Sequence, residues 1–367
     1  MAGLSVTILG AGGFLGAQLA AQLLSDGLLY TASGNALADP RLAETPISTL
    51  ILFDLHPPRV PANPLGIKVL SLSGDISDIG RLRPAIPQET AVVFHLAAIV
   101  SGQAEADYPL GRKVNIGGTE TLCALLAEHT TAGSPPARVI FTSSVASFSI
   151  DPTTLTSPSP TANFLSDASP QRPLNSYGAQ KAMMELLLSD LSRRGMLDAV
   201  NIRLPTISVR PGLPNAAASG FLSSLIREPL LGLPAICPVP EEDLGMRVWL
   251  ASPLTAVGWL RWCGVVETTS AEAKARWGPF RSVTPPGIST SIREIFDAVA
   301  RADADAVKLV RFEKDERVLE IVGKWPPGFH TERGVELGFL QAVGGIDGIV
   351  GEFLEVGMEQ TRVIRGM

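Results

Sequence analysis

The chain of 367 residues has a formal net charge of −6, which argues against a nucleic-acid backbone or an anionic membrane as its main partner. Hydrophobic residues make up 46% of it and charged residues 18%, so it can bury a large core and is not globally disordered. Its apolar runs are too short or too interrupted for a membrane span of about 20 residues.

The first residues predict a strand and a turn rather than a signal peptide. Cys123, Cys237 and Cys263 are scattered without metal-like spacing, and such a sparse set fits a reducing compartment and buried, inert thiols. We therefore expect a cytoplasmic protein without a metal site.

The first two-thirds of the chain alternates apolar runs with helical patterns. Strands are expected at 5–10, 48–55, 67–74, 91–98, 137–144 and 199–212, with helices at 14–27, 115–133 and 174–195. Unbroken apolar strands separated by helices are typical of a parallel sheet with helices on both faces. The pattern predicts an α/β fold of the Rossmann type, a doubly wound parallel sheet.

A boundary is expected near residue 210. Residues 1–210 would form the Rossmann domain, with 151–173, rich in Pro, Ser and Thr, as a long surface loop. Residues 211–367 would form mainly a smaller, discontinuous substrate-binding lobe, part of which returns to the Rossmann sheet. In this lobe we expect a strand at 308–312 and helices at 291–303, 314–323 and 345–356.

A glycine trio stands between the first strand and the first helix. Gly10 permits a tight turn, Gly13 lets backbone approach a pyrophosphate, and Gly16 lets helix and strand pack closely. The helix that starts with Phe14 and Leu15 points its positive end at the phosphates. A merely glycine-rich turn is the alternative.

The cofactor is predicted from the end of the second strand. Asp54 lies there, beyond an insertion in the first crossover, where a carboxylate binds both ribose hydroxyls of the adenosine and repels a 2′-phosphate. This favours NAD over NADP, although the nearby Arg59 argues the other way.

Further cofactor contacts are expected at two other strand ends. Asp75 and Ile76 would lie beside the adenine, although Asp75 can also be read as a helix cap. Leu96, Ala97 and Ala98 end the fourth strand, where small residues let a cofactor lie close.

Tyr177 and Lys181 are four residues apart on an expected helix and so share one face. A tyrosine is a poor base near neutral pH, but a nearby ammonium favours its phenolate. The pair can therefore take a hydroxyl proton. Ser144 ends the preceding strand and can bind the reacting oxygen, although Ser143 and Thr142 are neighbouring candidates.

Two buried polar residues are harder to assign. Asn115 opens a helix, where it either orders a water or backbone near the lysine or simply caps the helix. His95 lies in the middle of a strand and is interpreted as structural.

The motifs GxxGxxG, HLAA, TSS and YGxxK occur in this order across nearly the whole chain, which resembles the extended short-chain dehydrogenases/reductases, the family of nucleotide-sugar epimerases and dehydratases. The resemblance implies that Ser144, Tyr177 and Lys181 are catalytic and that Pro205 and Ile207 lie near the cofactor. Members of this family often pair as homodimers through helices that flank the sheet, one of them the helix of Tyr177, and the apolar side of that helix fits either such a pair or core packing.

Longer stretches, such as RPGLPNAAAS and IREPL, resemble the branch of this family that oxidises D-erythronate with NAD. The implied reaction converts the C2 hydroxyl of a small sugar acid to a 2-oxo acid. A carboxylate suits the planar fork of an arginine. Arg247 is the first candidate, since related uronate dehydrogenases place an arginine before a similar segment. The other substrate candidates are Ser101 and Asn215, with Arg210 and Arg227 as weaker ones.

Two other functions remain open. A nucleotide-sugar epimerase or dehydratase would retain NAD tightly and need a lobe that binds the nucleotide. A non-catalytic NAD(P)-sensing regulator of the same fold would typically lack the tyrosine and lysine that this chain has.

Overall fold

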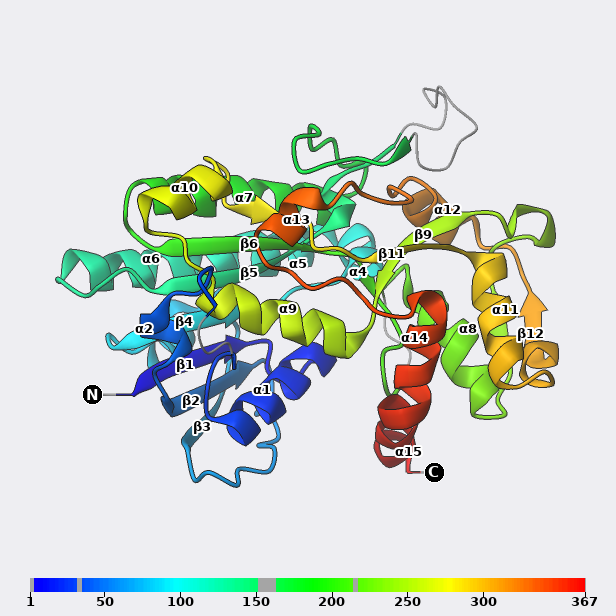
Figure 1. The fold of residues 1–367 in the computed structure, drawn as a ribbon, viewed down its shortest axis with the longest axis horizontal. Coiled ribbons are helices and arrows are strands. Elements are labelled where there is room, and N and C mark those ends of the chain that lie inside the picture. The colour runs from blue at the N-terminus through cyan, green and yellow to red at the C-terminus, as the bar shows by residue number, and fades with distance from the viewer. Residues whose placement is uncertain (1–2, 32–34, 151–162, 214–216, 367) are drawn as a thin grey trace.

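A computed structural model describes residues 3–31, 35–150, 163–213 and 217–366. Its centre is a seven-stranded parallel sheet in the order β10-β6-β5-β4-β1-β2-β3 (Figure 1). The strands are β1 (Leu4–Leu9), β2 (Ile47–Asp54), β3 (Lys68–Ser73), β4 (Thr90–His95), β5 (Arg138–Ser144), β6 (Asp198–Leu204) and β10 (Ser282–Val283). The strand order reverses between β1 and β4, and cofactors bind at the carboxyl ends of such a switch point. The predicted doubly wound fold is confirmed.

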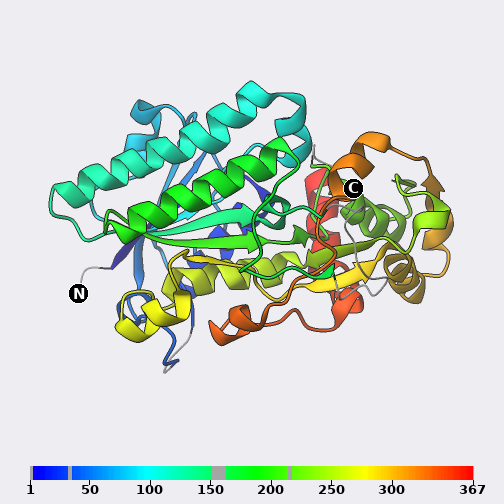
Figure 2. The same ribbon diagram turned by 90° about the horizontal axis from the view of Figure 1, so that it is seen from above.

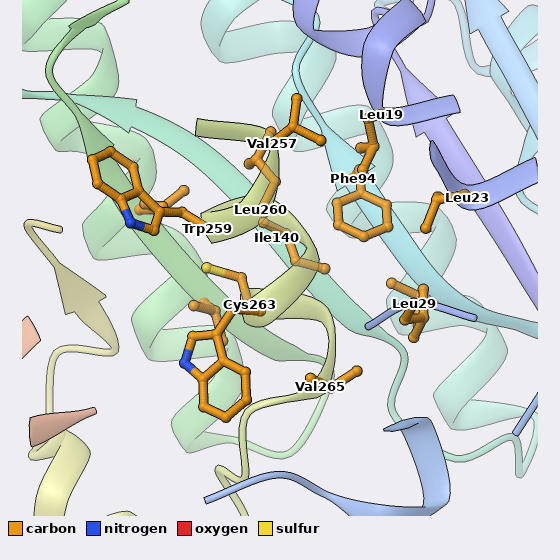
Figure 3. Close-up of a cluster of buried hydrophobic side chains, with 14 of the residues drawn as sticks. Leu19, Leu23, Leu29, Phe94, Ile140, Val257, Trp259, Leu260, Cys263 and Val265 are labelled. Carbon is orange, nitrogen blue, oxygen red and sulfur yellow. The ribbon is translucent and has the colours of Figure 1, made fainter. Parts of the chain in front are cut away.

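Helices cover both faces of the sheet (Figures 1 and 2). One face carries α1 (Phe14–Asp26) and α9 (Pro253–Val265), and the other carries α6 (Gly118–Thr131) and α7 (Ser176–Arg193). Because strand side chains alternate, Phe94 packs under α1 and α9 whereas Val93 belongs to the opposite core. Figure 3 shows the first core, where Leu19 and Leu23 of α1 face Val257 and Leu260 of α9 around Phe94.

The rest of the chain builds a second lobe beside the carboxyl ends of the sheet. Its small sheet has the order β11-β9-β7, and β8 pairs with β12. These strands are β7 (Thr206–Ile207), β8 (Ala235–Cys237), β9 (Arg247–Ala251), β11 (Ile288–Ser291) and β12 (Val310–Phe312). Its main helices are α8 (Gly220–Leu230), α11 (Ile292–Ala302), α12 (Glu316–Val322) and α14 (Gly345–Glu352).

The chain crosses between the lobes more than once. After β9 it returns to the central sheet as α9 and then as β10, which pairs with β6. The division at residue 210 therefore stays a prediction. The shorter helices are α2 (Pro40–Ala43), α3 (Ile79–Leu82), α4 (Ser101–Ala106), α5 (Tyr108–Gly111), α10 (Ala271–Trp277), α13 (Glu332–Glu336) and α15 (Met358–Arg365).

Two expected elements differ from the structure. The strand expected over 199–212 splits at Pro205 into β6 and β7, because proline has no N–H to donate to a ladder. The helix expected from Asn115 starts earlier, with a π-helical segment at Arg112–Gly117 that runs into α6. Of the expected loop 151–173, residues 151–162 lie outside the described part.

The cysteines Cys123, Cys237 and Cys263 are free and buried, as expected. Among the described residues no helix is long and apolar enough to span a membrane. The same residues contain no group of three or more His, Cys, Asp or Glu side chains arranged to hold a metal ion.

Candidate active site

The glycine trio forms the turn between β1 and α1 at the switch point. Gly10 has φ +88°, and a Cβ there would lie 2.6 Å from the backbone nitrogen of Ala97. A Cβ on Gly16 would overlap the carbonyl oxygen of Gly10. Gly13 is the N-cap of α1 and has no side chain to cap it, so the first amides of this helix are left for another partner. The turn thus has the close packing that a phosphate cradle needs.

Asp54 ends β2 directly beside this turn. Its carboxylate accepts hydrogen bonds from the backbone N–H of Gly12, at 2.8 Å, and of Leu55, at 2.7 Å. It lines a cavity of about 710 Å³ together with the exposed Arg59. The acidic group and the competing arginine predicted from the sequence therefore lie at the same cavity.

Asp75 and Ile76 line this cavity as well. Asp75 accepts hydrogen bonds from the backbone and hydroxyl of Ser77 and from Lys113, whose Nζ lies 2.7 Å away. The cap of α3 is Asp78. Asp75 is therefore not a cap of that helix, and its carboxylate is fixed at the rim of the cavity.

A second cavity, of about 320 Å³, continues from the first. Both are lined by Gly10, Gly13, Leu96 and Ala98. The second also contains the following predicted residues: Phe14, Leu15, Gly16, Ser144, Tyr177, Lys181, Pro205 and Ile207. Two joined cavities across a glycine turn, with an acidic group at one end and the tyrosine and lysine at the other, fit an extended dinucleotide such as NAD.

Tyr177 stands in the first turn of α7. Asn175 caps this helix by accepting a hydrogen bond from the backbone of Gly178 at 2.7 Å. A Cβ on Gly178 would overlap the carbonyl oxygen of Ala146, so α7 packs tightly against the segment that follows β5. This close packing brings Tyr177 beside Ser144.

The electrostatics of the pair differ from the expected pattern. Burial raises the pKa of Tyr177 to about 12, and the nearby Arg210 and a hydrogen bond with Ser144 act in the lowering direction. Burial lowers the pKa of Lys181 to about 7, against the effect of Glu185. Arg210 thus acts on the pKa of the tyrosine in the lowering direction, and burial outweighs this effect.

Of the three hydroxyls at the end of β5, two are engaged elsewhere. Ser143 donates to the carboxylate of Glu185, and Thr142 donates to the carbonyl oxygen of His95 at 3.0 Å. Ser144 accepts a hydrogen bond from the backbone of Ala146, at 3.1 Å, forms a hydrogen bond with Tyr177, and lines the cavity beside it. Ser144 is therefore the hydroxyl best placed to meet a substrate oxygen.

Asn115 and His95 support the site from behind. Asn115 lies within the π-helical segment, not at a cap, and bonds to both backbone groups of Ile99 and to Gln180. It therefore orders the backbone that follows β4. His95 is buried, and its Nε2 lies 2.9 Å from the hydroxyl oxygen of Thr119. Burial lowers the pKa of this imidazole to about 3. A neutral, packed imidazole agrees with the structural interpretation.

The expected substrate residues are not all brought together. Arg210 lines the second cavity, whereas Arg247 and Ser101 are absent from the described residues that line it. The guanidinium of Arg247 bonds to Ser289 and pairs with Glu294. The hydroxyl of Ser101 accepts a hydrogen bond from the backbone of Ala218. Asn215 lies outside the described residues.

Six residues that the sequence did not indicate also line the second cavity: Val100, Val145, Leu204, Thr206, Ser219 and Trp325. Thr206 and Ser219 flank Arg210 along the chain, so a search around that arginine could have found them. Trp325 comes from a distant loop of the second lobe, and no local pattern marks it.

Known proteins of similar sequence agree with an NAD-binding site in this chain. Residues 6–241 match the sequence profile of the NAD dependent epimerase/dehydratase family. A D-erythronate dehydrogenase of Cupriavidus necator is 42% identical over 96% of this chain and 98% of its own length. A second, from Haemophilus influenzae, is 33% identical over 97% and 100%.

A solved structure is similar over the same range. It is described as a nucleoside-diphosphate-sugar epimerase from Agrobacterium tumefaciens, is 37% identical, and superposes with a TM-score of 0.83 over 98% of this chain and 95% of its own. The family match covers more than half of the chain, and its fold, its glycine turn and its Tyr–Lys pair are all present. This chain belongs to the NAD-dependent epimerase/dehydratase family.

Proposed function

We propose that this protein oxidises the C2 hydroxyl of a small sugar acid, such as D-erythronate, to a 2-oxo acid with NAD. The observation that carries the proposal is the cavity in which Ser144, Tyr177 and Lys181 meet the glycine turn. The names of the two full-length relatives support the substrate class.

The proposed roles follow from the positions of the side chains. Tyr177 takes the proton of the C2 hydroxyl while Ser144 holds the same oxygen, since both line the cavity side by side. NAD supplies, when bound, the ring that accepts the hydride. The Nζ of Lys181 lies 5.6 Å from the centroid of the Tyr177 ring, where its charged form favours the phenolate and can hold the ribose next to the reacting ring.

The test is NADH formation from NAD with D-erythronate, L-threonate, a hexuronate or a UDP-sugar, one at a time. Turnover of a four-carbon acid that disappears in Tyr177→Phe is the expected result. Tyr177→Phe removes the hydroxyl and keeps the ring, so it is the matched control for packing. No NADH formation with any of the acids would overturn the proposal.

A second candidate is a nucleotide-sugar epimerase, favoured by the description of the similar Agrobacterium structure. It predicts conversion of a UDP-sugar without net NADH formation. Protein that copurifies with NAD and turns over none of these compounds would instead indicate a non-catalytic sensor.

We also propose that two copies pair through α7. The side chains of Met183 and Leu186 on this helix are 51% and 58% exposed, and α6 and α7 lie side by side on one face of the sheet (Figure 2). Light scattering should give twice the mass of one chain, and Leu186→Glu should halve it; a wild-type monomer would overturn the idea.

A cytoplasmic location is likewise proposed, supported by the three free thiols.

A further inference from the structure

We propose that Arg210, rather than Arg247, binds the carboxylate of the sugar acid. This rests on the proposed function and names the residue that selects an acid at the same site. Nothing in the family profile or in the names of the relatives assigns this role.

The chemistry of a 2-hydroxy acid restricts where the carboxylate lies. Its carboxyl carbon is bonded directly to C2, the carbon whose hydroxyl must contact Tyr177 and Ser144. A cation that binds the carboxylate must therefore lie next to these two side chains. An arginine farther along the lobe could reach only the remote end of a longer substrate.

Arg210 meets this requirement. It lines the same cavity as Tyr177 and Ser144, and the two groups interact electrostatically, since the guanidinium lowers the pKa of Tyr177. Its Cζ lies 5.8 Å from the centroid of the Phe14 ring, on the side of the cofactor turn. Burial lowers the pKa of Arg210 to about 10, so the guanidinium stays charged near neutral pH. A partly buried cation of this kind favours an anionic ligand.

The guanidinium is held in a defined position. Nε donates to the carbonyl oxygen of Ile207 at 3.1 Å, and Nη2 lies 3.3 Å from the hydroxyl of Ser219, which also lines the cavity. The backbone of Arg210 is held as well, because its N–H donates to Ser223 and its carbonyl accepts from Arg227 at 2.6 Å. Arg227 is therefore a support for Arg210 rather than a second ligand.

Arg247 fails the same requirement. β9 pairs with β7 so that Leu250 lies opposite Thr206, the cavity residue. Arg247 is three residues earlier in β9, about 10 Å along the strand. Ser289, at 3.0 Å and 2.8 Å, and Glu294, at 3.4 Å, hold the guanidinium of Arg247 at that end of the strand.

The test measures binding apart from turnover. In a Tyr177→Phe background saturated with NAD, calorimetry gives the affinity for D-erythronate. Adding Arg210→Met keeps the length of the stem and removes the charge, and we expect about a 100-fold loss of affinity, in the range for removing one partner of a hydrogen-bonded charge pair. Adding Arg247→Met should change the affinity far less. NAD affinity and the melting temperature of each variant show that it is folded.

Two further measurements test the role of Arg210. Arg210→Lys keeps the charge but loses the planar fork, so an intermediate affinity is expected. With otherwise wild-type enzyme, the preference for D-erythronate over its neutral amide, D-erythronamide, should shrink in Arg210→Met through a higher KM for the acid.

The outcomes separate the two proposals. A wild-type enzyme that oxidises neither the acid nor its amide overturns the proposed function. An active wild-type enzyme whose preference for the acid survives in Arg210→Met and Arg210→Lys, or is lost in Arg247→Met instead, overturns the inference alone.

Discussion

Lys181 donates from Nζ to the carbonyl oxygen of Thr142 across 2.6 Å, which ties the reacting end of α7 to the end of β5. The ammonium also lies 4.6 Å from the centroid of the Phe141 ring, and the Lys181 side chain is buried. The protein thus holds a cation where burial opposes its charge, an arrangement common at functional sites.

This arrangement predicts a pH-dependent difference in stability between the wild type and Lys181→Met. The pKa of Lys181 is about 7 in the fold against 10.5 for the free side chain, so the unfolded chain binds more protons between these values. The penalty for burying the lysine is therefore complete below about pH 7 and disappears as the pH rises toward 10.5. Lys181→Met should melt higher than the wild type at neutral pH, and this advantage should shrink under alkaline conditions.

Thermal melts of both proteins across this pH range check the prediction, and Lys113→Met, at an exposed lysine, is the control. A difference in melting temperature between Lys181→Met and the wild type that does not vary with pH would contradict the assigned pKa. The same variant should lose about 100-fold or more in turnover, since it removes the cation beside the base.

The pH dependence of the reaction itself follows from Tyr177. Its pKa is raised to about 12 by burial, and only the phenolate accepts a proton, so the rate of oxidation should rise with pH through the neutral and alkaline range. Arg210 lowers this pKa, so Arg210→Met should move the rising limb to higher pH. The measurement is kcat/KM for the sugar acid against pH. A rate that falls with pH over this range would argue against Tyr177 as the base.

Parts of the site could be predicted because they depend on local backbone requirements. Gly10 needs a positive φ and Gly16 has no space for a side chain, so the turn is visible in the sequence alone. The four-residue spacing of Tyr177 and Lys181 places them on one helical face whatever the rest of the fold does.

The choice of arginine could not be predicted in this way. Arg210 and Arg247 both follow apolar residues near the ends of short strands, and only the pairing of β7 with β9 shows which one reaches the cavity. The helical spacing also predicts a lowered pKa of Tyr177, because a helix face shows the neighbouring cation but not the burial that outweighs it.

The position of Asp54 leads to a prediction about the preference for NAD over NADP. Its carboxylate is fixed by the amides of Gly12 and Leu55, with Arg59 in the same cavity. Asp54→Ala should raise KM for NAD about tenfold or more and raise the activity with NADP relative to NAD, because the repulsion of a 2′-phosphate is lost while the arginine remains. Kinetics with both cofactors test this, and Arg59→Ala added to Asp54→Ala should abolish the gain with NADP. Equal use of both cofactors by the wild type would refute the role of Asp54.

The glycines of the turn predict a stability difference that does not depend on any ligand. Gly16 lies in α1, where a Cβ would overlap the carbonyl oxygen of Gly10, whereas a Cβ on Gly117, also helical, would have no neighbour within 4 Å. Gly16→Ala should therefore destabilise the fold by about 1–3 kcal/mol through strain. Gly117→Ala should stabilise it by up to about 1 kcal/mol, since alanine favours a helix. Urea unfolding without cofactor compares the two variants, and a Gly16→Ala variant as stable as Gly117→Ala would show that β1 and α1 do not pack as closely as the phosphate turn requires.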